Sequence, residues 1–131
     1  MHAVDTNVLL RWILNDHPVE SPAASAVLAD PVFIAATVLL ETGWVLHKRI
    51  GLDRATTASA LKATAALENA VIGRPELIDW AITRFERGAD WADVLHLVES
   101  AGLPTAFLTF DGKLGRQAGS GSPIPVQTLP I

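Results

Sequence analysis

Short apolar runs alternate with helix-length segments along this chain of 131 residues, and that alternation limits its fold more than any other feature. One short run ends at Val4, and the others cover 32–35, 70–72, 105–108 and 126–129. Strands separated by helices favour a parallel sheet covered by helices on both faces. The sequence therefore predicts an α/β fold, a three-layer α/β/α sandwich whose mainly parallel sheet has four or five strands.

The predicted helices are delimited by capping residues, prolines and glycines. In chain order they cover 8–14, 22–29, 38–50, 54–67, 75–87, 91–100 and 113–118. Their expected N-caps include Thr6 or Asn7 for the first helix, followed by Ser21, Thr37, Asp53 and Asp90. A chain of this length forms one domain as a rule, so we expect a single domain over residues 1–131.

Composition narrows the class of protein. The absence of cysteine excludes disulfides, thiolate metal sites and cysteine nucleophiles. No apolar stretch reaches the roughly 18 residues of a membrane span, and the start of the chain lacks the pattern of a signal peptide, so we expect a cytoplasmic protein. Half of the residues are hydrophobic, which indicates a partner surface in addition to a core.

Four acidic residues lie at junctions between predicted elements. Asp5 and Asp111 each follow a strand, where the ligand crevice of an open parallel sheet lies. Glu41 interrupts a long apolar segment, and glutamate is rarely buried without a partner. Asp93 lies three positions after Asp90, which brings its side chain over the same helix terminus.

Each acid also has a purely structural interpretation. Asp5 and Asp111 could cap helices or form turns, and Asp90 suits an N-cap. Glu41 could lie on a helix face that reaches solvent, or near a helix start where the dipole favours an acid. The net charge of −4 does not decide the matter, because it falls to zero when the four candidate ligands are left out.

Convergence of the four acids would demand a cation. Carboxylates that meet without a counter-ion repel one another and raise one another's pKa values. Oxygen ligands select a hard ion, Mg²⁺ or Mn²⁺. Such an ion neutralises a phosphodiester and activates water, so the expected reaction is phosphodiester hydrolysis.

Nearby polar and basic residues have secondary roles in this interpretation. Thr6 and Thr109 could fix the carboxylates by hydrogen bonds, and Arg11, Lys113 and Arg116 could bind flanking phosphates. Ordinary solvated charge is the alternative for each of the three cations. The four histidines show no metal-binding spacing, and the four tryptophans follow helical apolar patterns typical of cores or interfaces.

Four motifs together resemble a known family. They are Asp5-Thr6-Asn7 with the apolar residues after it, Glu41, the segment 88–93, and Thr109-Phe110-Asp111. In this order they resemble the PIN-domain nucleases, and among these the VapC-type toxins of bacterial toxin–antitoxin pairs. One departure is Trp91, where the family more often has phenylalanine.

The resemblance implies an α/β/α domain with Mg²⁺- or Mn²⁺-dependent endoribonuclease activity on RNA. It implies a homodimer inhibited by a small cognate antitoxin. By position, it makes Asp5, Glu41, Asp93 and Asp111 the catalytic acids, of which the three aspartates bind metal. Asn7 and Thr109 would be supporting polar residues, and Asp90 could also reach the metal.

Two other functions fit the scaffold. A phosphatase of the haloacid dehalogenase kind could use Asp5, but it needs a second Asp two positions on, where this chain has Asn7. A catalytically degenerate binding or signalling module is the other. A receiver-like module would want an acidic pair where Thr6 follows Asp5.

Overall fold

A computed structural model describes residues 1–130 of the chain. It divides into two compact units, Met1–Pro75 and Glu76–Ile131. The strands of residues 1–130 pair in parallel, which confirms the predicted α/β class. The single-domain expectation stays a prediction. No helix within these residues is long and apolar enough to cross a membrane.

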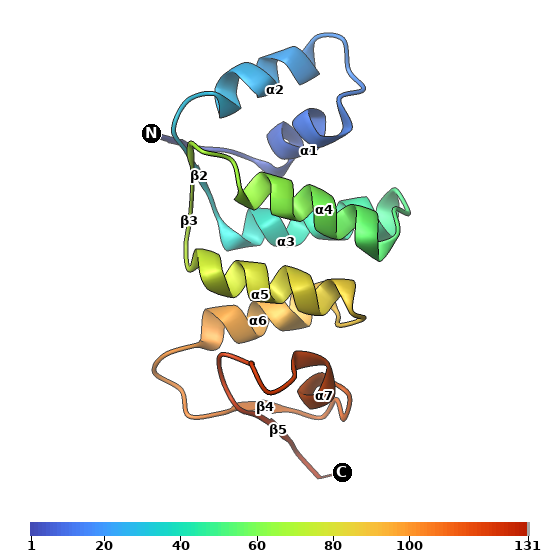
Figure 1. The fold of residues 1–131 in the computed structure, drawn as a ribbon, viewed down its shortest axis with the longest axis vertical. Helices are drawn as coiled ribbons and strands as arrows, with labels where there is room; N and C mark the ends of the chain where they lie inside the picture. Colours follow the sequence, from blue (N-terminus) through green and yellow to red (C-terminus); the bar gives the residue numbers. More distant parts are fainter. Residues whose placement is uncertain (131) are drawn as a thin grey trace. The chain divides into compact units, whose positions relative to one another are not determined.

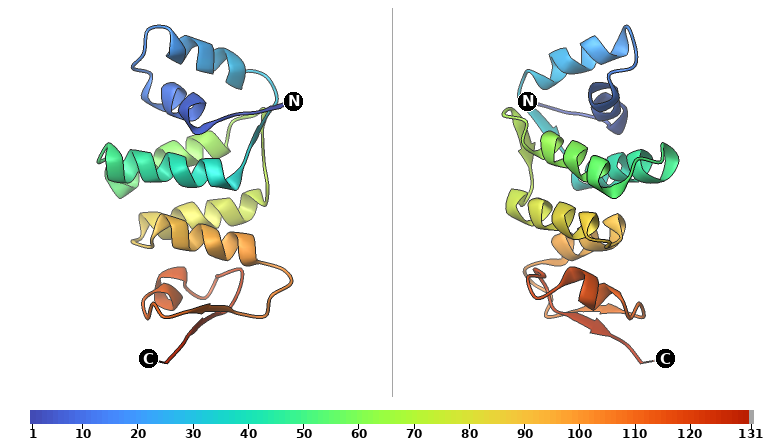
Figure 2. Two further views of the ribbon diagram at one scale, coloured as in Figure 1. Left: turned by 180° about the vertical axis from the view of Figure 1, so that it is seen from behind. Right: turned by 45° about the vertical axis from the view of Figure 1, so that its right-hand side comes forward.

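The first unit has a three-stranded sheet in the order β1-β2-β3 (Figure 1). The strands are β1 (His2–Ala3), β2 (Val32–Ile34) and β3 (Ala70–Ile72). The helical segments are α1 (Thr6–Leu14), α2 (Glu20–Leu28), α3 (Ala36–Trp44), the π-helical turn η1 (Val45–Arg49) and α4 (Arg54–Ala65). Helix α1 contacts both α2 and α3, and α3 contacts α4, as the views in Figure 2 also show. Central strand β2 buries Val32 and Ile34, the two β-branched residues that favour a covered strand.

Three helices of this unit begin elsewhere than predicted. Helix α1 begins at Thr6, and its N-cap is Asp5, whose Oδ1 accepts the Thr6 amide hydrogen at 2.7 Å. Ser21 lies inside α2, where its hydroxyl oxygen accepts from the His17 amide at 3.2 Å. Helix α3 begins at Ala36, so the predicted Thr37 cap is wrong. In the sequence, a short polar residue inside the first turn of a helix resembles an N-cap. Only the path of the chain before it decides which residue is the actual N-cap.

The end of α3 also departs from a regular helix. The predicted helix over 38–50 exists, but its last part widens into η1, where the Ile50 amide donates to the Val45 carbonyl at 2.8 Å. Such wider turns change the direction of the side chains that follow. Trp44 at the junction is 51% exposed, with the Arg49 guanidinium 6.0 Å from its ring centre, so this tryptophan is not a core residue.

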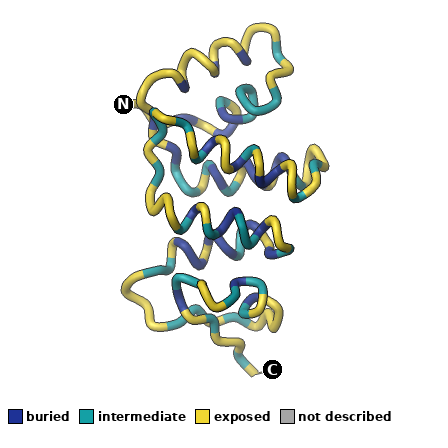
Figure 3. The backbone as a smooth tube through the Cα atoms, in the orientation of Figure 1, coloured by how far each residue is buried: buried dark blue, intermediate teal, exposed yellow. Residues whose placement is uncertain are grey.

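The second unit contains α5 (Pro75–Glu86), α6 (Trp91–Ser100), β4 (Phe107–Thr109), α7 (Leu114–Ala118) and β5 (Val126–Thr128). Strands β4 and β5 form a two-stranded parallel sheet. Buried residues recur along α5 and α6, as expected for amphipathic helices (Figure 3). A cluster of Leu97, Leu114, Ala118 and Ile124 forms the core beside this sheet.

Two leucines of this unit provide a matched test of its core. Leu97 is fully buried, whereas Leu103 is 98% exposed. We expect Leu97→Ala to lower the free energy of unfolding by about 2–5 kcal/mol, because it leaves a cavity in the cluster. Leu103→Ala removes the same atoms and should change it by less than about 0.5 kcal/mol. Chemical denaturation of both variants measures the difference, and equal effects would contradict the burial of Leu97 in this cluster.

Candidate metal centre

Asp5 lies where β1 passes directly into α1. The Val4 amide donates to the Phe33 carbonyl at 3.2 Å, which continues the pairing with β2 up to this point. The chain then turns into the helix at Asp5, whose backbone is extended and whose carboxylate accepts from the Thr6 amide. Asp5 is exposed, and it lies at the carboxyl end of a parallel strand, as the sequence predicted.

Thr6 joins Asp5 to Glu41. Its backbone amide binds the Asp5 carboxylate, and its hydroxyl donates to Glu41 Oε1 at 2.5 Å. Thr6 is only 5% exposed, whereas the carboxylates on either side of it are exposed. A buried hydroxyl with one fixed acceptor therefore holds an acid of α3 beside the start of α1.

In the second unit, Asp93 interacts electrostatically with two other aspartates, Asp90 and Asp111. Asp90 is the N-cap of α6, and its Oδ2 accepts from the Asp93 amide at 3.0 Å. Burial raises the pKa of Asp93 above its ordinary value, and the charges of Asp90 and Asp111 raise it further, while His96 lowers it. Asp93 and Asp111 are thus close enough to interact electrostatically, although 18 positions separate them in the printed sequence.

Asp111 is held in a turn after β4. Its amide donates to the Thr109 hydroxyl oxygen at 3.0 Å, and its Oδ1 accepts from the Lys113 amide at 2.9 Å. The side chain of Thr109 therefore fixes the backbone before Asp111 and does not itself bind the carboxylate. Like Asp5, Asp111 lies just past the end of a parallel strand.

The donor chemistry of both groups fits a hard divalent cation. Every acidic side chain named above offers carboxylate oxygen, which Mg²⁺ and Mn²⁺ prefer. Burial and two neighbouring carboxylates disfavour ionised Asp93, and a cation beside it would reverse that effect. Within residues 1–130, no three acidic or histidine side chains are already arranged as a complete ligand set.

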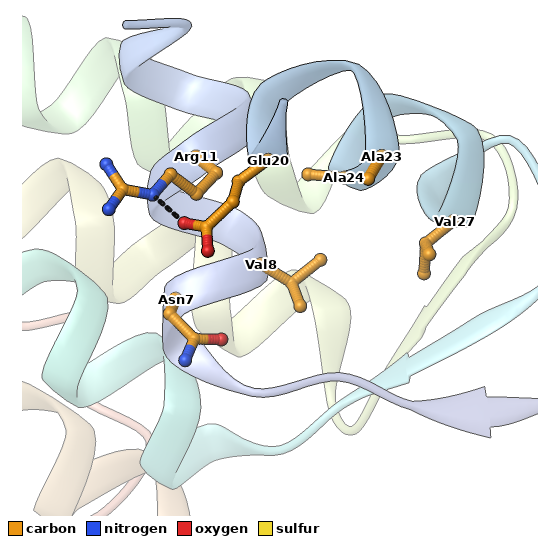
Figure 4. A pocket seen from close by; sticks show the side chains of 7 residues that line it. All are labelled: Asn7, Val8, Arg11, Glu20, Ala23, Ala24 and Val27. Atoms are coloured by element: carbon orange, nitrogen blue, oxygen red, sulfur yellow. Dashed lines mark hydrogen bonds and ion pairs between the residues drawn. The ribbon is translucent and has the colours of Figure 1, made fainter. Parts of the chain in front are cut away.

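Asn7, predicted as a supporting residue, and Arg11, predicted to bind a flanking phosphate, both line a hollow between α1 and α2. Asn7 and Arg11 face it together with Val8, Glu20, Ala23, Ala24 and Val27, and its volume is about 250 Å³ (Figure 4). Arg11 is engaged there, since its Nε donates to Glu20 Oε1 at 2.7 Å and its Nη1 lies 3.5 Å from Asp16. Its positive charge is thus neutralised locally, which weakens the expectation that it binds phosphate.

Lys113 and Arg116 lie in a second, strongly polar hollow. Arg84, Arg87 and Gln117 complete its lining. No signal in the sequence pointed to Arg84 and Arg87, because the first lies on an amphipathic helix and the second directly after it, both about 30 positions before α7.

The sequence also matches one known protein family. The model of the PIN domain matches residues 3–119, which include all four predicted catalytic acids. This chain belongs to the PIN-domain family. PIN domains are generally metal-dependent nucleases that bind nucleic acid. Searches of curated proteins and of solved structures found no match.

The raised pKa of Asp93 predicts a pH-dependent effect on stability. A folded-state pKa above the unfolded value means that the free energy of unfolding falls as the pH rises through the raised pKa. Asp93→Asn removes this loss. Without divalent cations, the variant should be more stable than the parent at neutral pH, and the gain should vanish below the ordinary pKa of 3.8.

Asp53→Asn is a control of opposite sign. Hydrogen bonds from Thr56 lower the pKa of Asp53, so its stabilisation is present above 3.8 and is lost as the pH falls through the lowered value. This variant should therefore be less stable than the parent at neutral pH. Urea denaturation across the acid-to-neutral range measures both. A loss of stability in Asp93→Asn at neutral pH would contradict the electrostatic description of the second unit.

Proposed function

We propose that this PIN domain is a Mg²⁺- or Mn²⁺-dependent endoribonuclease, the toxin of a toxin–antitoxin pair. In this proposal Asp5, Glu41, Asp93 and Asp111 are the catalytic acids, and the three aspartates bind the metal. The observation that carries it is the Thr6 bridge, which fixes Asp5 beside Glu41 in a member of a nuclease family. The second support is the electrostatic interaction of Asp93 with Asp111.

In this proposal each residue has a separate role in phosphodiester hydrolysis. A bound Mg²⁺ or Mn²⁺ would supply positive charge against the phosphate and would increase the acidity of water. Thr6 occupies Glu41 Oε1, which leaves Oε2 able to accept a proton from the attacking water. The raised pKa of Asp93 means that its ionised form is disfavoured, and a cation beside it would favour that form, so Asp93 favours the metal-loaded state. Asp90 orients the start of α6 and so positions Asp93.

The exposed apolar surface supports a proposal about protein partners. Large apolar side chains that remain exposed include Val19, Phe33, Trp44, Val71, Leu103, Leu108 and Phe110. Such surface is typical of interaction sites, so we propose a cognate antitoxin protein and a homodimer as partners, and the cytoplasm as their location.

Loss of a single metal ligand tests the centre. Asp5→Asn and Asp93→Asn should each reduce Mg²⁺-dependent RNA cleavage by about a hundredfold or more, because a neutral amide binds the cation weakly. Asp30→Asn and Asp79→Asn make the same charge change at exposed aspartates of the respective units. They should cleave RNA like the parent. Undiminished cleavage by both ligand variants would refute the proposed centre.

Thr6→Val tests the bridge as a positioning device. The variant keeps the shape of a buried residue but removes the hydroxyl that holds Glu41, so kcat should fall by about tenfold to a hundredfold with little change in KM. Thr6→Ser should restore most of the activity. Thr64→Val removes an equally buried hydroxyl, one that donates to Ala60 within α4, and should leave kcat unchanged. Equal kcat values for Thr6→Val and Thr64→Val would reduce the bridge to a structural contact.

A further inference from the structure

Four cationic side chains surround one polar hollow in the second unit. Arg84 lies on α5 and Arg87 in the turn directly after it, while Lys113 is the N-cap of α7 and Arg116 lies on that helix. The hollow has a volume of about 300 Å³, and Gln117 completes its lining. At roughly 30 Å³ per water molecule, that space holds about ten waters, enough for a hydrated phosphate group.

Arg84 has a fixed position in this hollow. Its Nε donates to the Gln117 carbonyl at 2.6 Å, and its Nη2 lies 3.5 Å from the Arg116 carbonyl oxygen. Gly119, whose φ is +76°, lets the guanidinium approach, because a Cβ there would lie 3.1 Å from the Arg84 Cζ. Two of the five guanidinium donors are thus used to tie α5 to α7, and three stay available for a ligand.

The positive charge of the hollow has no acidic partner. Within residues 1–130, no aspartate or glutamate lies in salt-bridge range of Arg84, Arg87, Lys113 or Arg116. Arg11 of the first unit is the contrasting case, since two carboxylates neutralise it. Four cations that repel one another around a polar space are stabilised most by an anion with several acceptor oxygens.

We propose that this hollow binds backbone phosphates of a single-stranded RNA, next to the bond that is cut. The inference rests on the proposed function and names its substrate-binding surface. The link to the catalytic acids is local, because the Lys113 amide donates to the carboxylate of Asp111. In this proposal, a strand whose phosphates occupy the hollow also passes Asp111.

The chemistry of the lining favours RNA over an acidic protein segment. Guanidinium forks match the oxygens of a phosphate and bind them in a bidentate manner. A protein partner would require a buried apolar or aromatic anchor, and every side chain that lines this hollow is charged or polar.

Salt-dependent binding tests the proposal without any need for cleavage. The parent for this experiment carries Asp5→Asn, so that bound RNA stays intact. The double variant Arg87→Gln/Arg116→Gln changes two exposed cations of the hollow and spares Arg84 and its contacts to α7. The control Arg54→Gln/Lys62→Gln makes the same charge change on α4. Fluorescence anisotropy follows a short, labelled, single-stranded oligouridylate over a range of salt concentrations.

The expected result is a smaller salt dependence in the hollow variant. Each lost phosphate contact should lower the slope of log K against log salt by about 0.7, so the double variant should lose up to about 1.4 and the control nothing. Lys113→Gln, as a second variant, should lose about 0.7. Equal slopes for the hollow and control variants would overturn the proposal.

One further outcome distinguishes RNA from an acidic protein as the ligand of the hollow, and another distinguishes the binding surface from the catalytic acids. If polyglutamate binding depends on the hollow cations and RNA binding does not, the hollow belongs to an acidic protein partner and the proposal fails. Reduced RNA binding in the hollow variant supports the proposal even where the parent without Asp5→Asn shows no cleavage. In that case the fault lies with the catalytic centre and not with the binding surface.

Discussion

The hydrogen bond from the Thr6 hydroxyl to Glu41 is the contact on which the arrangement of the candidate acids in the first unit depends. It joins residues 35 positions apart, and it does so at the point where β1 becomes α1. Hydrogen bonds to charged groups contribute about 1.5–3 kcal/mol, more than neutral ones, and a buried donor is costly to leave unpaired. The geometry of Asp5 is coupled to the same residue, since its carboxylate binds the Thr6 amide.

The candidate acid Asp93 of the second unit lies near other acids, in contrast to the donor-bound acids of the first unit. In the first unit, hydrogen-bond donors hold Asp5 and Glu41, whereas Asp93 has one acidic neighbour at the N-cap of its own helix and another after β4. Burial of such a group costs stability when it is ionised, and proteins tolerate this cost mainly where a site needs it. A PIN domain that binds a divalent cation requires such a carboxylate, because the bound ion stabilises its ionised form and offsets the loss of stability.

Acidic and basic side chains lie close together around α7 in the second unit. The acid Asp111 precedes the helix, and Lys113 and Arg116 follow within five positions. The net charge of −4 hides this local alternation of signs. Arg84 is central to it, because its bonds to the Gln117 and Arg116 carbonyls hold the end of α5, and Arg87 directly after it, at the same hollow. Nucleic-acid binding in an acidic protein is therefore a matter of placement and not of total charge.

Hydrophobic period and turn chemistry in the sequence were enough to predict the parallel α/β class, most element positions and the caps at Asp53 and Asp90. These signals are local, so a single short segment of the sequence is enough to predict each helix, strand or cap. They failed at Thr37 and Ser21, where a polar residue within the first turn resembles a cap. The positions of Asp5 and Asp111 after strands were predictable for the same local reason. Tertiary structure alone decided that Thr6 binds Glu41, that Asp111 affects Asp93, and that Arg11 is neutralised while Arg87 and Arg116 are not. Those outcomes depend on which helices pack together, and side-chain pairing across long sequence separations leaves no periodic trace in the sequence.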